Sequence, residues 1–152
     1  MILVTGATGH LGNVLVRKLL DLGEKVRVMI LPDETLASLH GLMVEVINGD
    51  ILNPEDLRRA MNGIDMVYHL AGIIAISPGM EKIMHRVNVE GARNVAEIAL
   101  EKEVERLVHV SSVHAFQREP HGVIMNEATP LALESPVGSY DRTKAEGTRA
   151  VL

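Results

Sequence analysis

Residues 2–12 read ILVTGATGHLG, a short apolar run that passes directly into three glycines at equal spacing, Gly6, Gly9 and Gly12. A helical stripe of apolar residues follows at once, over residues 10–22. A strand that turns through glycines into a helix leaves backbone N–H groups and the positive end of the helix dipole at the turn. Residues 6–12, the glycine loop, are therefore predicted to receive an anionic group.

The rest of the chain alternates between short apolar runs and helical patterns. Strands are predicted at residues 2–5, 26–31, 44–47, 66–70 and 107–110. Helices are predicted at 10–22, 33–39 (shorter and weaker), 53–63, 81–101 and from 139 onward. Gly23 is placed to end the first helix, and Asn53 followed by Pro54 is typical of a helix start. The alternation predicts an α/β Rossmann domain over residues 1–152, with a doubly wound parallel sheet in the order 3-2-1-4-5.

The context of the glycine loop indicates which anion it binds. Gly6 allows the tight turn, Gly9 lets backbone approach a pyrophosphate, and Gly12 lets helix and strand pack closely. No Gly-Lys-Ser or Gly-Lys-Thr occurs, which excludes a triphosphate-binding P-loop. A plain strand–helix turn is the alternative, but strand, glycines and helix in register favour NAD or NADP.

The choice between NAD and NADP depends on the end of the second strand. An acid there would hold the ribose 2′-hydroxyl, whereas an arginine would accommodate a 2′-phosphate. The first acid is Asp33, beyond Pro32, and no arginine is present, which favours NAD. Asp33 could equally cap a helix. Asp50, after the third strand, could reach the adenine edge or be a solvated turn residue.

Composition narrows the class of protein. Hydrophobic residues make up 47% and aromatic residues only 2%, so the core must be aliphatic, as buried parallel strands require. The net charge of −5 without a basic cluster argues against a nucleic-acid partner. No apolar stretch approaches the roughly 20 residues of a membrane helix, so no membrane partner is expected. The seven histidines lack metal-binding spacing and there is no cysteine, so no metal site is proposed; His69 and His109 are expected in the core or hydrogen-bonded.

Tyr140 and Lys144 stand four residues apart and therefore share one face of the last predicted helix. A neighbouring ammonium favours the phenolate form of a tyrosine, so the pair can exchange a proton with a substrate hydroxyl while hydride moves to a nicotinamide. Tyr-x-x-x-Lys alone is common and is usually just a surface pair.

Three motifs in order are more specific. The glycine loop, Ser111-Ser112 at the end of the fifth strand, and Tyr140 with Lys144 resemble the short-chain dehydrogenase/reductase superfamily. More narrowly, they resemble its extended branch, the NAD-dependent epimerase/dehydratase family with the dihydroflavonol-reductase-like proteins. The resemblance covers almost the whole chain and includes HLAG at 69–72, VNVEGARN at 87–94 and NEATP at 126–130.

The resemblance implies roles for individual residues. Ser112, rather than Ser111, would hold the substrate oxygen, Tyr140 would be the acid–base, and Lys144 would bind the nicotinamide ribose and tune Tyr140. Asn88 would support a backbone carbonyl or a relay water, unless it only packs its helix. The residues expected to hold the dinucleotide are Gly6, Thr8, Gly9, His10, Leu11, Gly12, Asp33, Asp50, Ile51, Leu70, Ala71, Gly72, Asn88 and Lys144.

Two departures from the family pattern affect the reaction. Val113 and His114 stand where sugar-nucleotide dehydratases carry an acidic pair, and Phe116-Gln117 replaces the usual Tyr-Gly. These residues disfavour a 4,6-dehydratase and the standard epimerases, and fit reductase-like or hopanoid-type epimerase-like subgroups better. The leading hypothesis is an NAD(P)-dependent oxidoreductase or epimerase that acts by hydride transfer on a secondary alcohol or ketone, with a nucleotide sugar as one candidate. The alternative is a non-catalytic dinucleotide sensor or scaffold.

The end of the chain predicts that more polypeptide follows. Residues 148–152 are an uncapped apolar helix, and family members build their substrate pocket from a longer C-terminal part, so we expect a substrate domain that this chain lacks. The N-terminus does not resemble a signal peptide, which makes a cytoplasmic protein the default expectation. Beyond a small-molecule substrate, a homodimer through the long helices is the partner that related proteins suggest.

Overall fold

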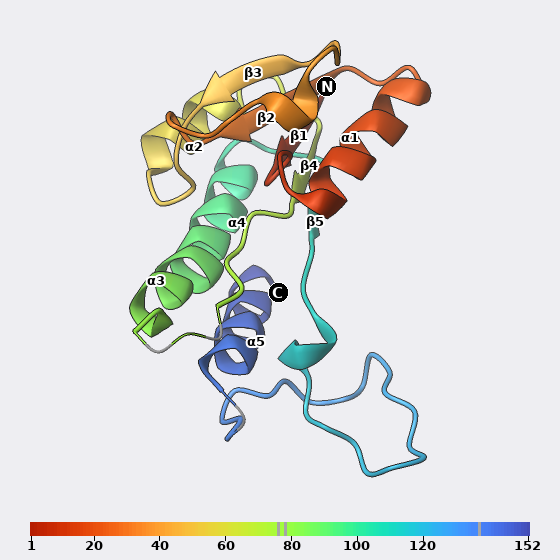
Figure 1. Cartoon of the computed structure of the whole chain (residues 1–152), viewed down its shortest axis with the longest axis vertical. Helices are drawn as coiled ribbons and strands as arrows, with labels where there is room; N and C mark the ends of the chain where they lie inside the picture. Colours follow the sequence, from red (N-terminus) through yellow and green to blue (C-terminus); the bar gives the residue numbers. More distant parts are fainter. Residues whose placement is uncertain (76, 78, 137) are drawn as a thin grey trace.

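A five-stranded parallel sheet lies in the upper half of the view in Figure 1, with helix α5 (Ser139–Val151) below it. The computed structural model describes residues 1–75, 77, 79–136 and 138–152. The strands are β1 (Ile2–Thr5), β2 (Val26–Ile30), β3 (Glu45–Asn48), β4 (Met66–His69) and β5 (Arg106–His109). Their order is β3-β2-β1-β4-β5, and each neighbouring pair is parallel, which confirms the predicted topology.

Helices cover both faces of this sheet. They are α1 (His10–Asp21), η1 (Ala37–Leu39), α2 (Pro54–Ala60), α3 (Glu81–His85), η2 (Arg86–Gly91), α4 (Ala92–Glu101), η3 (Val113–Ala115) and α5 (Ser139–Val151). Alternate residues of β1 enter two separate aliphatic cores: Val4 packs with Val16 of α1, whereas Leu3 packs with Leu57 of α2 and Val95 of α4. The result is the three-layer arrangement expected of a doubly wound sheet.

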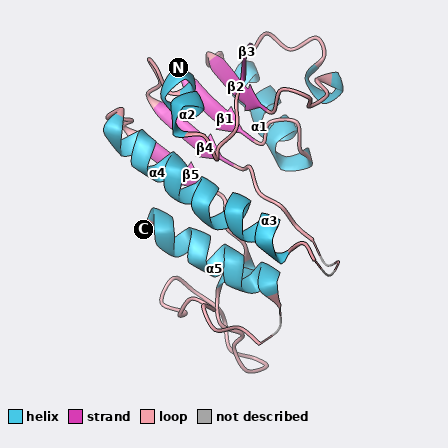
Figure 2. Ribbon diagram, turned by 90° about the vertical axis from the view of Figure 1, so that its left-hand side faces the viewer, coloured by secondary structure: helices cyan, strands magenta, loops and turns pink. Residues whose placement is uncertain are grey.

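α5 lies along the helix formed by α3, η2 and α4 on one side of the molecule (Figure 2). The predicted helix over residues 81–101 is helical throughout, but its middle, Arg86–Gly91, is a π-helix rather than an α-helix. α5 packs against this segment so closely that a Cβ on Gly147 would lie 2.1 Å from the carbonyl oxygen of Asn88. Glycine at 147 is therefore a packing requirement, and it brings the Tyr140–Lys144 helix against the π segment.

The residues predicted to begin and end two of the helices do so in the structure. Asn53 accepts a hydrogen bond from the backbone N–H of Glu55, with Pro54 in the first turn of α2, and Gly23 after α1 has a φ of +81°. Both features confirm the predicted helix boundaries.

The helix predicted over residues 33–39 is wrong, because only the short 3₁₀ turn Ala37–Leu39 forms there. Side chains accept from backbone N–H groups in this segment and just before it. Glu34 accepts from the N–H of Leu31, and Thr35 accepts from the N–H of Ala37. Such local bonds compete with helix formation, and they leave this segment as a loop beside the glycine loop.

Candidate dinucleotide and Tyr–Lys site

The glycine loop is closely packed on one side and open on the other. Gly6 has a φ of +70°, and a Cβ there would lie 2.7 Å from the backbone nitrogen of Ala71. A Cβ on Gly12 would lie 2.1 Å from the carbonyl oxygen of Gly6. At Gly9 the nearest atom would be 3.4 Å away, and among the described residues no side chain caps α1 at this position. The helix N-terminus can therefore receive an outside anion next to Gly9.

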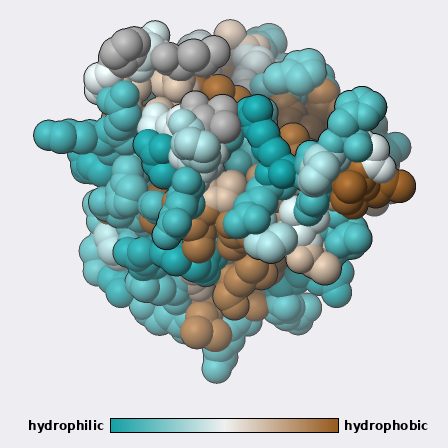
Figure 3. All heavy atoms as spheres, turned by 90° about the horizontal axis from the view of Figure 1, so that it is seen from below, coloured by the Kyte–Doolittle hydropathy of each residue, from teal (hydrophilic) through white to brown (hydrophobic). Residues whose placement is uncertain are grey.

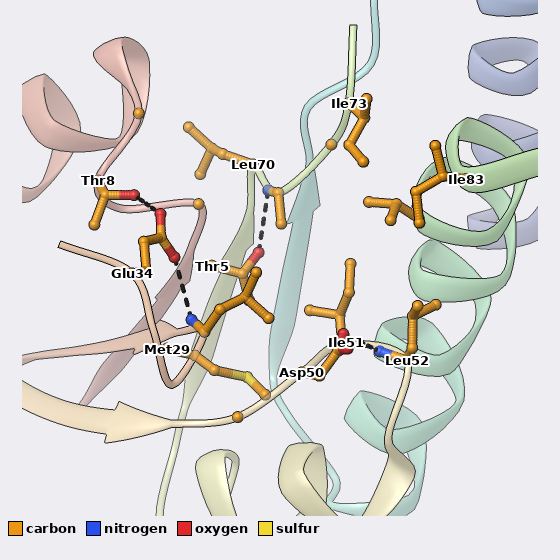
Figure 4. Close-up of a pocket in the computed structure, with 17 residues that line it drawn as sticks. Thr5, Thr8, Met29, Glu34, Asp50, Ile51, Leu52, Leu70, Ile73 and Ile83 are labelled. Carbon is orange, nitrogen blue, oxygen red and sulfur yellow. Dashed lines mark hydrogen bonds between the residues drawn. The ribbon is translucent and has the colours of Figure 1, made fainter. Parts of the chain in front are cut away.

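A cavity of about 400 Å³ opens beside this loop (Figure 4). Its walls come from the carboxyl ends of four strands and from the helix that contains α3 and η2. The lining residues are Thr5, Gly6, Thr8, Gly9, Met29, Leu31, Glu34, Gly49, Asp50, Ile51, Leu52, Leu70, Ala71, Gly72, Ile73, Ile83 and Val87. The carboxyl edge of a parallel sheet is where this architecture binds ligands.

Glu34 is an acidic residue of this cavity that the sequence did not predict. One of its carboxylate oxygens accepts from the N–H of Leu31 at 3.1 Å, and the other accepts from the hydroxyl of Thr8. The side chain thus connects the loop after β2 to the glycine loop. Asp33, the predicted acid, is exposed and is not among the described residues that line the cavity.

The loop after β3 contributes Asp50 and Ile51, both predicted. The carboxylate of Asp50 accepts from the N–H of Leu52 at 2.9 Å, so it closes its own turn while it lines the cavity. Ile51 is 8% exposed and packs over Gly91, where a Cβ would lie 2.5 Å from the Cδ1 of Ile51. The turn therefore fixes the cavity wall. His10 and Leu11, in the first turn of α1, are exposed and are not among the described lining residues.

A second cavity of about 130 Å³ adjoins the first, since Leu70, Gly72 and Ile73 line both. Its other lining residues are Ile74, Asn88, Val110, Ser111, Tyr140 and Lys144. The Nζ of Lys144 donates to the carbonyl oxygen of Val110 at 3.0 Å. Burial lowers the pKa of Lys144 below its ordinary value. The structure thus brings Tyr140 and Lys144 from α5 to the end of β5, where they line the smaller cavity that adjoins the larger one.

The two serines after β5 differ in position. Ser111 lines the smaller cavity, and its hydroxyl lies 2.5 Å from that of Thr148. Ser112 accepts from the N–H of His114 at 3.2 Å and begins η3. Of these two serines, only Ser111 is among the described residues that line the smaller cavity. The role of Ser112 in holding a substrate oxygen therefore stays a prediction.

The side chain of Asn88, in the π segment, hydrogen-bonds to the loop after β4 and to α5. It is 4% exposed, and its amide exchanges hydrogen bonds with the N–H and the carbonyl of Ile73, at 2.8 and 2.9 Å. It also donates to the hydroxyl of Thr143 at 3.2 Å. Asn88 therefore ties the loop after β4 to α5. Within the described chain, no group of three or more acidic or histidine side chains is placed to bind a metal ion.

A buried histidine, His69, and a half-buried one, His109, stand side by side at the carboxyl edge. His69 and His109 are register partners on β4 and β5, with ring centroids 5.3 Å apart. His69 is 1% exposed and shares a 2.8 Å hydrogen bond with Thr5, while its Nε2 has no partner in the described part of the chain. Burial, followed by the charges of His109 and Lys144, lowers the pKa of His69 to about 3. Burial and Lys144 lower the pKa of His109 to about 4.

We expect the protein to lose stability in mild acid because of His69. In the unfolded chain the imidazole takes up a proton near pH 6.5, but in the folded chain it does so only near pH 3, so stability falls as the pH drops between these values. At pH 4 the loss from His69 alone is about 3 kcal/mol. Urea unfolding at pH 7 and pH 4 measures this loss in the free energy of unfolding. His69→Gln should lose about 3 kcal/mol less than the unaltered protein between the two pH values, with the loss from His109 remaining, whereas the exposed control His40→Gln should behave as the unaltered protein. Equal losses in all three proteins would contradict this origin.

Comparison with known proteins agrees with the geometry. Residues 2–152 match the NAD dependent epimerase/dehydratase family. Sterol demethylase protein B from Methylococcus capsulatus is 41% identical over 150 residues, which cover 99% of this chain and 45% of that protein. Ceramide reductase from Caulobacter vibrioides is 39% identical over 120 residues, which cover 79% of this chain and 36% of that protein.

A solved structure shares the fold along the chain. A short-chain dehydrogenase/reductase superfamily protein from Agrobacterium tumefaciens, crystallised with bound NAD, is 32% identical with a TM-score of 0.84, over 99% of this chain and 44% of that one. The chain thus spans less than half the length of these three proteins. Over the described residues, no helix is both long and apolar enough to cross a bilayer. The chain belongs to the NAD-dependent epimerase/dehydratase family.

Proposed function

We propose that this chain is the dinucleotide-binding part of an NAD-dependent oxidoreductase that acts on a secondary alcohol or ketone. The observation that carries this proposal is the pair of adjoining cavities. The larger lies against the glycine loop and the smaller against Tyr140 and Lys144, and the two share the wall formed by Leu70, Gly72 and Ile73. One extended ligand could therefore contact the helix N-terminus at one end and the Tyr–Lys pair at the other.

The residues present fit a dinucleotide. The space that a Cβ on Gly9 would enter is open, the first turn of α1 is uncapped by any described side chain, and Glu34 offers carboxylate oxygens to ribose hydroxyls. We assign the pyrophosphate to the glycine loop, the adenosine ribose to Glu34 and the nicotinamide ribose to Lys144. When bound, the nicotinamide would supply or accept the hydride.

The chain's own contribution to the reaction is proton transfer and positioning. We assign the acid–base role to Tyr140: its phenolic oxygen would give a proton to the substrate oxygen or take one from it. The Nζ of Lys144 donates to the carbonyl oxygen of Val110 at 3.0 Å, so the charge of Lys144 stays fixed beside the smaller cavity. An ammonium fixed there stabilises the negative charge that develops on the phenol.

We further propose a lipophilic substrate. The smaller cavity is lined by Leu70, Ile73, Ile74 and Val110 next to the reacting pair. Apolar side chains also reach the surface at the end of the molecule seen in Figure 3, and exposed ones follow β4 and β5, with Ile74 at 74% and Val113 at 70%. Two relatives carry lipid names, a sterol demethylase protein and a ceramide reductase. A cytoplasmic location and a homodimer remain predictions from the sequence.

Hydride transfer by the full-length gene product tests the proposed function. The protein is mixed with NADH deuterated at C4 and a panel of ketones that includes steroid, long-chain acyl and nucleotide-sugar substrates, and deuterium in the product is measured by mass spectrometry. We expect transfer to a lipophilic ketone. Tight NADH binding without transfer to any member, and without oxidation of the matching alcohols by NAD, would instead favour the sensor alternative. Transfer confined to a nucleotide sugar would overturn the lipophilic assignment alone.

Glu34 gives a prediction on cofactor choice. A carboxylate accepts hydrogen bonds from the ribose hydroxyls of NAD and repels the 2′-phosphate of NADP. We therefore expect Glu34→Arg to shift the ratio of the NADH and NADPH dissociation constants toward NADPH by at least tenfold, about 1.4 kcal/mol. Asp33→Arg is the matched control, because this neighbouring acid is exposed like Glu34 but is absent from the described cavity wall. Fluorescence titration measures both, and a larger shift in Asp33→Arg would return the ribose role to Asp33.

A further inference from the structure

His114 is bound to a buried carboxylate beside the candidate catalytic tyrosine. Its Nδ1 lies 3.0 Å from the Oδ1 of Asp141, a residue in the first turn of α5 whose side chain is only 9% exposed. The hydroxyl of Ser135 donates to the other oxygen of the same carboxylate at 3.3 Å. Asp141 thus has partners on both oxygens, and one of them comes from η3, the turn that follows β5.

The same imidazole contacts Tyr140 directly. The two ring centroids are 5.7 Å apart with an interplanar angle of 63°, an edge-to-face arrangement. Such pairs contribute about 0.5–1.5 kcal/mol beyond the area that they bury, and they favour one relative orientation. Because Asp141 follows Tyr140 in the helix, His114 is bonded to one residue of α5 and packed against the residue before it.

The bond to Asp141 fixes the imidazole. The side-chain oxygen of Asp141 accepts from Nδ1 of His114 at 3.0 Å, which sets the tautomer and the ring plane of the imidazole. A ring that is held in this way can limit the rotation of the phenol that it touches.

The other paired histidine of comparable exposure lacks this arrangement. His85 is also 49% exposed and lies near two carboxylates, at 3.5 Å from Glu90 and 3.4 Å from Glu146. Both of those carboxylates are far more exposed than Asp141, at 47% and 29%. His85 therefore represents an ordinary surface pair, and His114 is distinguished by its buried anchor and its aromatic contact.

We propose that His114 is a positioning residue for Tyr140: anchored by Asp141, its ring holds the phenol in the orientation in which it lines the smaller cavity, as Lys144 does. This inference rests on the proposed oxidoreductase function. It predicts that the contribution of His114 appears in the chemical step and not in dinucleotide binding, since His114 is outside the described residues that line the larger cavity.

Steady-state kinetics of the full-length gene product test the role of His114. We expect His114→Ala to lower kcat about 10- to 100-fold, the usual effect of misplacing a reacting group by an ångström or less. The dissociation constant for NADH should stay within twofold. His114→Phe keeps an aromatic edge for Tyr140 but loses the bond to Asp141, so it should recover only part of the lost kcat. The matched control His85→Ala should leave kcat unchanged.

The outcomes separate this proposal from the function on which it rests. If the unaltered protein transfers hydride and His114→Ala does so at the same rate, the positioning role is wrong. If His114→Phe transfers hydride as fast as the unaltered protein, the bond to Asp141 is not what holds the ring in place and the proposal is overturned. Absence of hydride transfer in the unaltered protein, with intact NADH binding, removes the proposed function itself.

Discussion

Replacing Tyr140 by phenylalanine is expected to lower hydride transfer by the full-length protein about 10²- to 10⁴-fold, the range that a lost acid–base group usually costs. The substitution removes one oxygen atom and leaves the ring, so the edge contact with His114 is kept. Lys144 keeps its bond to the carbonyl of Val110, because that bond does not involve the phenol. Folding and dinucleotide affinity should therefore be unchanged while the chemical step fails.

The chain supplies its own control for this experiment. Tyr68, the other of its two tyrosines, lies in β4 and packs with the core on the α1 face of the sheet, away from Lys144. Single-turnover rates at saturating NADH and substrate should be near those of the unaltered protein in Tyr68→Phe and strongly reduced in Tyr140→Phe. Equal rates in the two variants would remove Tyr140 from the mechanism.

The strand order of the sheet could be predicted from the sequence, because several independent patterns indicate each strand and its neighbours. Short apolar runs separated by helical patterns leave few ways to build a parallel sheet, and the glycine loop identifies the first strand. The observed strands differ from the predicted ranges by a residue or so at their ends, as at β3, where the prediction was 44–47 and the strand is Glu45–Asn48. Helical periodicity did not show the π segment Arg86–Gly91, because the buried residues along it still recur at intervals of three or four, as they do in an α-helix.

The details of the site were harder to predict because they depend on side-chain direction in loops. Asp33 and Glu34 are adjacent acids, and only the folded loop determines that Glu34 reaches Thr8 and Leu31. Ser111 and Ser112 pose the same problem, since neighbouring residues after a strand point in different directions and a shift of one position exchanges them. Tyr140 and Lys144 were predictable because helical spacing fixes their common face. The anchor of His114 joins residues 27 positions apart and has no local signal.

Gly12→Ala is expected to destabilise the protein by about 3 kcal/mol or more, at the upper end of the cost of overpacking. The added Cβ would lie 2.1 Å from the carbonyl oxygen of Gly6 and 2.9 Å from the Cα of Ala7. Both are backbone atoms next to the buried end of β1, so no side-chain rotation can relieve the contact. α1 would have to move away from the sheet, and the packing of Val16 against Val4 would loosen.

Gly9→Ala provides the contrast that locates this effect. Its Cβ would meet only the carbonyl oxygen of Gly6, at an ordinary 3.4 Å, so the fold should tolerate it. The methyl group would instead occupy the open side of the loop, where we assign the pyrophosphate. Urea unfolding and NADH titration should therefore separate the two glycines: Gly12→Ala loses stability, and Gly9→Ala keeps stability while its dissociation constant for NADH rises at least tenfold. Unchanged stability in Gly12→Ala would mean that α1 can shift without cost, and unchanged affinity in Gly9→Ala would move the pyrophosphate away from this loop.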